Sequence, residues 1–398
     1  MRVLHLEAAR GEAGAPTIDR GLTLLDDRWV ACVSGRDLHL HDLTADPRTP
    51  AFIVPAGGQH TAALDVLITH DVAHHFRRFT RTGDRWHEAT RFTLPAPHAG
   101  WPGDPQLSPS GRYLCVELPA HADERHGWVV LLDAHDGREI TAHPRYLSAR
   151  ATFVTLHGRE LLLLSAPSYM GVLLIDPATG RTLHAFEPTQ SWDFCHTDYA
   201  LTADGARLVV FGCVWAAPYE LRLYDATPWT ADTPASSDGF PLPQLLNQPE
   251  SIPGETVLPA QLHDHGDGTL DVYSLISQRD LAADLAADPD IEPGLDGTDR
   301  AILATLRDLP GPAALLQRRV DLASARVVGW TAAPIRPTGE THVHALPGHR
   351  AALVGAGVQR FDGRTGAVTD GPACTVPPGW FLSAVTPDGQ RVVIRTLA

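Results

Sequence analysis

The chain repeats one short phrase at a regular spacing, and this repetition restricts the possible folds more than any other feature. Each copy has an apolar segment of strand length, a turn that contains glycine, and a second apolar segment. Copies lie around Gly111, Gly158 and Gly205, which are 47 residues apart, and the phrase returns at Gly389. Glycine suits such a turn because a tight hairpin needs a positive φ, which other residues adopt only with strain. Repeats of about this length are typical of chains built from stacked supersecondary units.

A second repeated phrase is a strand that ends in aspartate, followed by a short turn and a glycine. Clear copies span residues 129–137, 172–180 and 358–366, and weaker copies contain Asp42, Asp225 and Asp321. An aspartate at this position accepts hydrogen bonds from the backbone N–H groups of the turn. We therefore predict that the aspartates of this phrase are structural and not catalytic.

The two ends of the chain carry complementary parts of the repeat. Residues 3–11 match the second phrase, whereas residues 381–397 contain the first phrase alone. We expect one unit to take its inner two strands from the C-terminus and its outer strands from the N-terminus. This pairing would close a ring of sheets and remove the open sheet edges that promote aggregation.

These patterns predict an all-β chain that forms a single β-propeller domain of four-stranded blades over residues 1–398. The aspartate-type anchors mark eight units, near residues 7, 42, 79, 133, 176, 225, 321 and 362. The unit near Phe79 is degenerate, so seven and eight blades both stay open, and the count slightly favours eight.

The repeated phrases resemble those of the bacterial β-propeller repeat families, the WD-repeat and YVTN-type rings. The likeness lies in the turns around Gly111, Gly205 and Gly389 and in the aspartate phrases at residues 129–137 and 172–180. It covers nearly the whole chain and implies a fold but no particular activity. The Trp-Asp pair that ends a WD strand is absent from these positions.

Composition excludes several classes of partner. The formal net charge is -15 and no run of basic residues occurs, which disfavours nucleic acid. No apolar stretch approaches the roughly 20 residues of a membrane helix, and the start lacks the apolar segment of a signal peptide. Five widely spaced cysteines without a CxxC pair predict buried thiols in a cytoplasmic protein. No nucleotide-binding or metalloprotease motif occurs, so we expect no cofactor.

Two insertions interrupt the repeat between Asp225 and Asp321. Residues 227–256 are rich in proline and predict an irregular loop. Residues 279–312 predict short acidic helices around Leu281, Leu285, Ile302 and Leu306, placed between the second and third strands of a blade. They either decorate the surface or form a docking face for a partner, because loops carry binding more often than a packed scaffold does.

Histidines form the main candidate binding site. His263-Asp264-His265 and His342-Val343-His344 lie on the predicted inner strands of two successive blades, and alternation directs each pair of histidines to one face. The two pairs could meet as metal ligands, as a ligand-binding or catalytic group, or as hydrogen-bonded core residues.

A second polar cluster contains Asp193, Cys195, His196 and Asp198. A Cys–His couple beside carboxylates could supply a thiolate nucleophile, but neighbours on an extended strand point to opposite sides. We include His196 as a candidate binding residue and assign no catalytic residue.

Two functions from different classes follow from these observations. The first is a non-catalytic propeller that acts as a scaffold or binding module for another protein. The second is a hydrolase- or lyase-type enzyme with its site at the mouth of a central channel, either with or without a metal ion. The fold hosts both classes, so fold alone does not choose between them.

Overall fold

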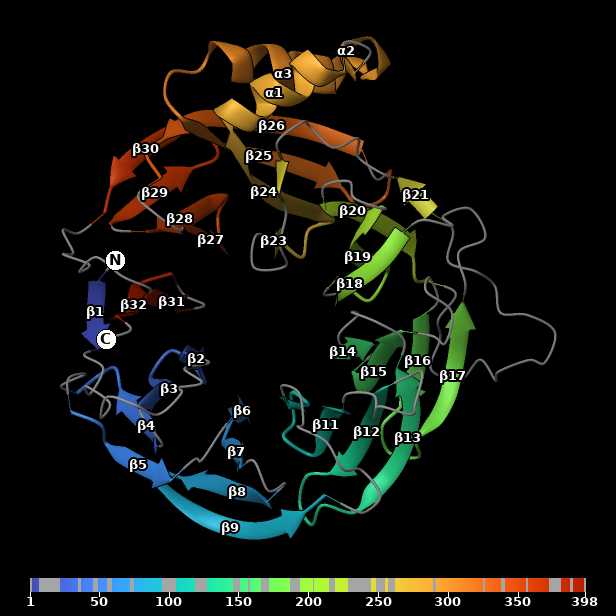
Figure 1. The fold of residues 1–398 in the computed structure, drawn as a ribbon, viewed down its shortest axis with the longest axis vertical. Coiled ribbons are helices and arrows are strands. Elements are labelled where there is room, and N and C mark those ends of the chain that lie inside the picture. Colours follow the sequence, from blue (N-terminus) through green and yellow to red (C-terminus); the bar gives the residue numbers. More distant parts are fainter. Residues whose placement is uncertain are drawn as a thin grey trace. The chain divides into compact units, whose positions relative to one another are not determined.

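The structure is a computed structural model, and it describes most of the chain. The described residues are 2–6, 22–34, 37–45, 49–55, 59–71, 75–94, 105–118, 127–145, 151–156, 158–165, 172–186, 194–202, 204–214, 219–227, 245–247, 255–256, 262–288, 291–324, 326–337, 341–355, 357–371, 381–386 and 389–396. Within these ranges the chain is all-β apart from three short helices, and the strands form eight separate sheets (Figure 1). None of the described helices is long and apolar enough to cross a membrane.

The chain divides into two compact units. The larger unit contains residues 2–190, 231–240 and 379–398, and the smaller contains residue 1 with residues 191–230 and 241–378. Each is described below by itself.

The larger unit contains five sheets, four of them four-stranded antiparallel meanders. The meanders are β2 (Leu22–Leu24), β3 (Trp29–Ser34), β4 (Asp37–Asp42) and β5 (Phe52–Pro55); β6 (Gln59–Ala63), β7 (Val66–His70), β8 (His75–Thr82) and β9 (Arg85–Thr93); β10 (Gln106–Leu107), β11 (Tyr113–Leu118), β12 (Gly127–Asp133) and β13 (Glu139–Arg145); and β14 (Thr152–Leu156), β15 (Arg159–Ser165), β16 (Val172–Asp176) and β17 (Arg181–Phe186). The degenerate unit near Phe79 is the complete sheet β6–β9.

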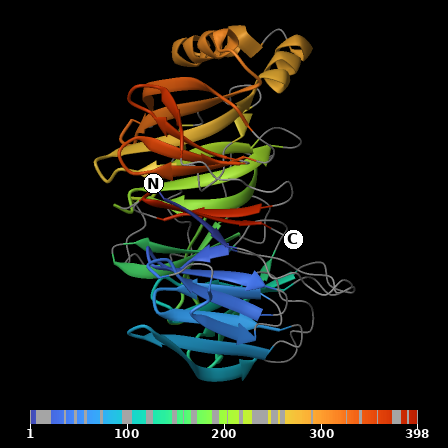
Figure 2. The same ribbon diagram turned by 90° about the vertical axis from the view of Figure 1, so that its left-hand side faces the viewer.

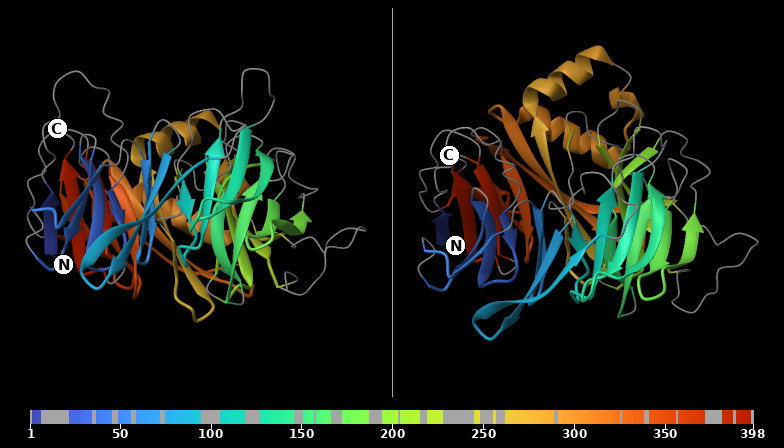
Figure 3. Two further views of the ribbon diagram at one scale, coloured as in Figure 1. Left: turned by 90° about the horizontal axis from the view of Figure 1, so that it is seen from below. Right: turned by 60° about the horizontal axis from the view of Figure 1, so that its bottom comes forward.

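The fifth sheet of this unit joins the two ends of the chain. Its strands are β1 (Arg2–Leu6), β32 (Arg391–Thr396) and β31 (Phe381–Val385), in that order. β1 pairs with β32 in parallel, with Arg2 opposite Arg391. Figure 3 shows dark-blue and red strands side by side near the N-terminus. The predicted pairing of the termini is therefore present, whereas the number of blades and the closure of a ring stay predictions.

Apolar side chains between successive sheets form the core of the larger unit. Trp29, Leu38 and Leu40 pack against Leu67, Phe79 and Trp86 of the next sheet. Further clusters join β6–β9 to β10–β13 and β10–β13 to β14–β17. Strands that are buried on both faces consist almost entirely of apolar residues. In β11 (Tyr113–Leu118), for example, every residue is buried. Cys32 and Cys115 are buried, as expected for two of the five thiols.

The smaller unit contains three sheets. Their strands are β18 (Phe194–Leu201), β19 (Arg207–Val214), β20 (Tyr219–Asp225) and β21 (Leu245–Asn247); β22 (Glu255–Thr256), β23 (Leu262–Asp264), β24 (Thr269–Ser277), β25 (Ala313–Asp321) and β26 (Arg326–Ile335); and β27 (His342–Leu346), β28 (Arg350–Val354), β29 (Val358–Asp362) and β30 (Ala367–Asp370). In the middle sheet both β22 and β23 pair with β24.

Three helices lie between β24 and β25, where the sequence predicts them. They are α1 (Gln278–Ala287), α2 (Ile291–Gly294) and α3 (Gly297–Asp308). Figure 2 shows them beside the sheet β22–β26 of the same unit. Leu281, Ile302 and Leu306 are buried there against Ile276 and Leu316 of the sheet, because these are the apolar positions that recur with helical periodicity.

The prediction of an irregular loop over residues 227–256 is wrong for the residues that the structure describes within it. Leu245–Asn247 is strand β21, the fourth strand of its sheet, and Glu255–Thr256 is strand β22. Pro243 and Pro249 flank β21. Prolines near a strand favoured the prediction of a loop, because proline cannot donate a ladder hydrogen bond.

The turn residues behave as the repeat predicts. Gly111, Gly158, Gly205 and Gly389 all have positive φ. At Gly111 a Cβ atom would also lie 2.7 Å from Cγ2 of Val66, so glycine is required there for space as well as for conformation. The aspartates of the second phrase accept backbone hydrogen bonds two residues ahead, for example His135 N to Asp133 at 2.9 Å and Ala178 N to Asp176 at 3.1 Å. Their structural role is confirmed.

Candidate functional site

The candidate site lies in the smaller unit, where two hairpins of successive sheets approach one buried carboxylate. Asp271 is the third residue of β24 and stands opposite His263 of β23 and Arg319 of β25. Alternation along β24 directs Tyr273 to the same face. Tyr273 contacts Phe361 of the next sheet, so Asp271 lies on the face that packs against β27–β30.

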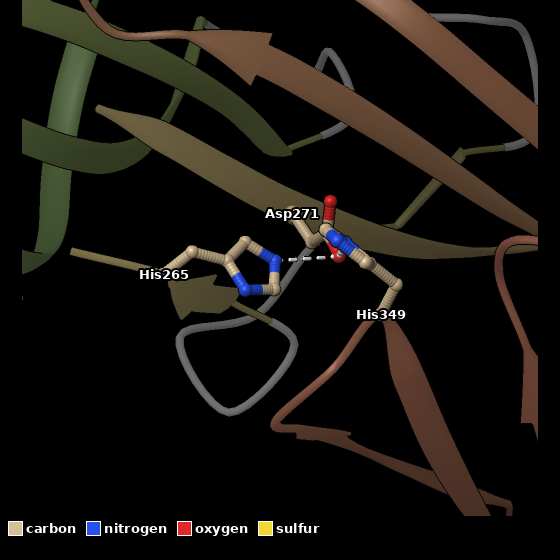
Figure 4. Close-up of side chains that lie close together, drawn as sticks. All are labelled: His265, Asp271 and His349. Carbon is tan, nitrogen blue, oxygen red and sulfur yellow. Dashed lines mark hydrogen bonds and ion pairs between the residues drawn. The ribbon is translucent and has the colours of Figure 1, made fainter. Parts of the chain in front are cut away.

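Asp271 is fully buried and accepts hydrogen bonds from four side chains. Its Oδ2 atom is 2.9 Å from His265 Nε2 and 2.8 Å from His349 Nδ1 (Figure 4). Its Oδ1 atom is 3.3 Å from Nε of Arg319, and the hydroxyl of Tyr273 is 3.4 Å from Oδ2. Each carboxylate oxygen therefore has a donor, which is the condition under which a protein tolerates a buried charge.

The hairpins also bring three imidazole rings together. The ring centroids of His265 and His349 are 4.1 Å apart, and those of His263 and His265 are 4.7 Å apart. The side chains of His265 and His349 keep 10% and 14% of their surface exposed, so the site lies at the edge of the packed face and is open to solvent at one side.

Burial and hydrogen bonding act in opposite directions on the carboxylate. Burial alone raises the pKa of Asp271, but the hydrogen bonds from His265 and His349 outweigh it, so this pKa lies below its usual range. The pKa of the Tyr273 hydroxyl is raised, by burial first and by the neighbouring Asp271 charge second. Asp271 is thus held as an anion, with a neutral phenol beside it.

His349 has an unusual backbone conformation. Its φ is 61°, directly after Gly348 at 76°, in the hairpin between β27 and β28. Leu64 and His349 are the non-glycine residues with positive φ within the described ranges. Such a conformation favours glycine, although histidine adopts it more readily than most other residues, and it directs the imidazole toward Asp271.

Comparison with known proteins shows the fold. No protein-family model matches the chain, and no curated protein matches it. Among solved structures, the dihydro-heme d1 dehydrogenase NirN in complex with DHE aligns with a TM-score of 0.53 and 12% identity, covering 97% of this chain and 72% of that chain. The β-propeller domain of Cps50 (Swd1) from Myceliophteria thermophila aligns at 0.47, with 11% identity and coverage of 85% and 93%. AztD from Citrobacter koseri aligns at 0.48, with 11% identity and coverage of 94% and 88%.

The chain has a β-propeller fold. At such low identity the likeness extends to the fold alone. The predicted resemblance to propeller repeat families is therefore confirmed at the level of fold, and the function of this propeller has to be inferred from its own side chains.

The structure places only part of the predicted histidine group on strands, because His265 follows β23 in the hairpin turn, where its ring still contacts that of His263. His263 and Asp264 are on β23, and His342 and His344 are on β27, the first strand of the next sheet. The group whose ligand atoms converge within the described ranges is His265, Asp271 and His349. His342 and His344 are not part of it, because the β27–β28 hairpin, and not the strand, reaches toward Asp271.

Two other predicted residues have different positions. The side chain of Asp264 accepts a hydrogen bond from the backbone N–H of Gly266 at 2.8 Å, so it caps the hairpin turn. His196 lies on β18 opposite Gly212, next to an irregularity in the pairing register between His196 and Asp198. The side chains of this segment fall outside the described part of the structure.

Sequence reasoning missed Asp271 and His349. A signal for Asp271 was present, because a charged residue between Leu270 and Val272 in a buried strand needs a buried partner. For His349 the signal was weaker: the turn Pro347-Gly348-His349 does not reveal that the histidine occupies a position suited to glycine.

His344 allows a prediction about pH. Its pKa is lowered from 6.5 to about 4, first by burial and second by the nearby His342. Between pH 6.5 and 4 the unfolded chain therefore binds a proton that the folded chain does not, and folding loses stability as the pH falls. The loss should reach roughly 3 kcal/mol at pH 4.

We expect the imidazole resonances of His344 to titrate near pH 4 in NMR spectra of the folded protein. His344→Leu should reduce the loss of stability between pH 6.5 and 4.5 in urea unfolding. A midpoint near 6.5 would contradict the burial that the structure assigns to this ring.

Proposed function

We propose that this propeller is a non-catalytic interaction module that binds another protein through the platform formed by α1–α3, residues 278–308. The observation that carries the proposal is that the insertion is a built structure with its own core. An additional 35-residue segment is not needed to join β24 to β25, because Ser277 and Ala313 already face each other across the two strands.

The platform is anchored firmly on the sheet. Its core combines residues of the helical segment with residues of β24 and β25, namely Ile276, Leu281, Leu295, Ile302, Leu303, Leu306, Ala314 and Leu316. The side chains of Ser277 and Asp296 cap the N-termini of α1 and α3. An ion pair of 2.7 Å between Arg307 and Glu292 joins α3 to α2. A surface held in this way can bind a partner with little loss of conformational entropy.

Most exposed residues of α1 carry little side-chain entropy. Ala282, Ala283, Ala286 and Ala287 are all exposed, with Asp284 among them. Alanine has no rotamer freedom to lose when a partner covers it. Exposed alanines on a rigid helix therefore favour contact with another protein surface.

The charge of the platform indicates the chemistry of the partner. Residues 278–308 contain eight acidic and three basic residues. Asp284 lies in the last turn of α1 and Asp288 caps its C-terminus, and this last turn contains no basic residue. The negative end of a helix dipole disfavours carboxylates at this position. A partner that presents lysine or arginine would relieve this repulsion, so we propose that the partner surface is basic.

The partner can be captured from the cells that make the protein with a photo-cross-linking residue at position 283, on the exposed face of α1. Its affinity is then measured with purified components. Asp284→Asn with Asp288→Asn should raise the Kd about 30-fold, because each lost interfacial charge costs roughly 1 kcal/mol. The wild-type affinity should fall with added salt.

The matched control is Asp136→Asn with Asp370→Asn, which removes two exposed charges from other sheets. This pair should leave the Kd unchanged. Charge variants are preferable to deletion of residues 279–312, because deletion would expose Ile276 and Leu316. No cross-linked protein, or an equal Kd for both double variants, would refute the proposal. The second candidate function, a hydrolase or lyase, stays a prediction.

A further inference from the structure

We infer that His265, Asp271 and His349 form a binding site for a divalent transition-metal ion of the Zn²⁺ type. The site lies where the β23–β24 and β27–β28 hairpins meet (Figure 4). It is a second site, distinct from the α1–α3 platform, and the inference does not depend on the proposed partner.

The donor set suits such an ion. Two imidazole nitrogens and one carboxylate oxygen converge, and all the ligand atoms lie within 4.8 Å of one another. Imidazole and carboxylate together favour zinc and related transition metals over Mg²⁺ or Ca²⁺, which prefer oxygen ligands alone. Three protein ligands leave a coordination position for water or for a fourth ligand.

The ligand atoms are already close to the spacing that an ion requires. His265 Nε2 and His349 Nδ1 lie 2.9 and 2.8 Å from Asp271 Oδ2. Bonds of about 2.0–2.1 Å in tetrahedral geometry place neighbouring ligand atoms about 3.3 Å apart. An ion would therefore replace the two bridging protons after the ligand atoms separate by about half an ångström.

Neighbouring side chains hold the carboxylate in position. Arg319 donates to Oδ1, the oxygen that the histidines leave available, and Tyr273 donates from the same face of the strand. Such outer hydrogen bonds commonly orient ligating carboxylates. His263, whose ring packs against His265, is the nearest candidate for a fourth ligand.

The local charge also favours a cation. Asp264 and Asp267 lie in the same hairpin as His265. The chain as a whole carries a net charge of -15. Negative charge near the site favours the approach of a cation, and the charge of Arg319 is paired with that of Asp271.

The conformation of His349 supplies an independent argument. Glycine would occupy φ of 61° without strain, yet the chain has a histidine there, and its ring reaches a carboxylate 78 positions away in the sequence. A role that needs the imidazole explains why the strain is retained.

The test uses the full-length protein, freed of metal with a chelator and then titrated with Co²⁺ and with Zn²⁺. We expect one equivalent to bind, with d–d absorption bands from Co²⁺ and a higher Tm in the presence of Zn²⁺. His349→Gly should weaken binding about 100-fold or more, since even outer-shell substitutions cost 10- to 100-fold. The variant also relieves the backbone strain, and its circular dichroism spectrum separates lost binding from misfolding. Asp271→Asn should act in the same direction.

Two control variants show whether the metal ion binds to histidines outside the cluster. His75→Ala removes an exposed histidine of the larger unit, and His342→Ala removes a histidine of β27 that is not in the cluster. Both should keep the wild-type stoichiometry and affinity. The inference is overturned if the wild-type protein binds neither ion, or if His349→Gly binds as tightly as His75→Ala. In either case the cluster is a hydrogen-bond network without an ion.

Discussion

Replacement of Asp271 by alanine is expected to lower the free energy of unfolding by about 3–5 kcal/mol in metal-free protein. Asp271 is completely buried and accepts hydrogen bonds from His265, His349 and Arg319. Without the carboxylate these donors keep their position inside the packed face but lose their acceptor, and an uncompensated buried donor costs its full desolvation. Urea unfolding monitored by circular dichroism, with chelator present, measures the effect.

Two further variants show how much of the lost stability results from the missing hydrogen-bond acceptor of Asp271. Asp271→Asn retains the shape and one acceptor, so it should be destabilising by less than the alanine variant. Asp267→Asn, on the exposed part of the same hairpin, should leave the stability nearly unchanged, because asparagine can still accept the hydrogen bonds from Thr269. If the free energy of unfolding of Asp271→Ala lies within about 1 kcal/mol of the wild-type value, the hydrogen bonds of Asp271 do not hold the two hairpins together.

The same carboxylate makes stability depend on pH in the acid range. Because its pKa in the folded protein lies below its value in the unfolded chain, its contribution is fully present above about pH 4 and declines as the pH falls through the folded pKa. In Asp271→Asn this decline should be smaller than in the wild type.

Trp29→Ala is the second substitution with a large expected effect, a loss of about 3–5 kcal/mol in the larger unit. Trp29 is 2% exposed and packs edge-to-face against Trp86, with ring centroids 6.4 Å apart. The guanidinium of Arg81 lies 5.8 Å from the Trp29 ring centroid and 5.6 Å from that of Trp86. Removing the indole leaves a cavity and withdraws one of these two aromatic faces from the cation.

Trp29→Phe provides the matched comparison. It keeps an aromatic ring, and it removes an indole N–H that has no hydrogen-bond partner among the described residues, so we expect a loss of only about 1–2 kcal/mol. Val328→Thr, at a side chain that is 60% exposed, should be close to neutral. Equal losses for the alanine and phenylalanine variants would show that the cavity is not the main cause.

The sheets of this propeller could be predicted from sequence because each depends on neighbouring residues. Gly111 and Gly205 mark their hairpins through the positive φ that the turn requires, and Asp133 and Asp176 mark turns through their own side-chain hydrogen bonds. The helical insertion could be predicted for the same reason, since the spacing of Leu281, Leu285, Ile302 and Leu306 is local. Strand β21 was missed because flanking prolines resemble those of a loop.

The repeated phrases of the sequence thus determined the β-propeller fold and the pairing of the chain ends. The apolar spacing within the insertion that interrupts the repeat determined the position of the helical platform. Those features depend on local turn chemistry and on apolar periodicity, which a single sequence displays directly. Only the tertiary structure decided that His265 meets Asp271 and His349, and that His342 and His344 are not part of the cluster. Asp271 and His349 are separated by 78 positions, and their contact depends on how two sheets pack and how far one hairpin extends. No local sequence pattern indicates a contact between residues so far apart in the chain, so the candidate metal site is recognised only in the folded structure.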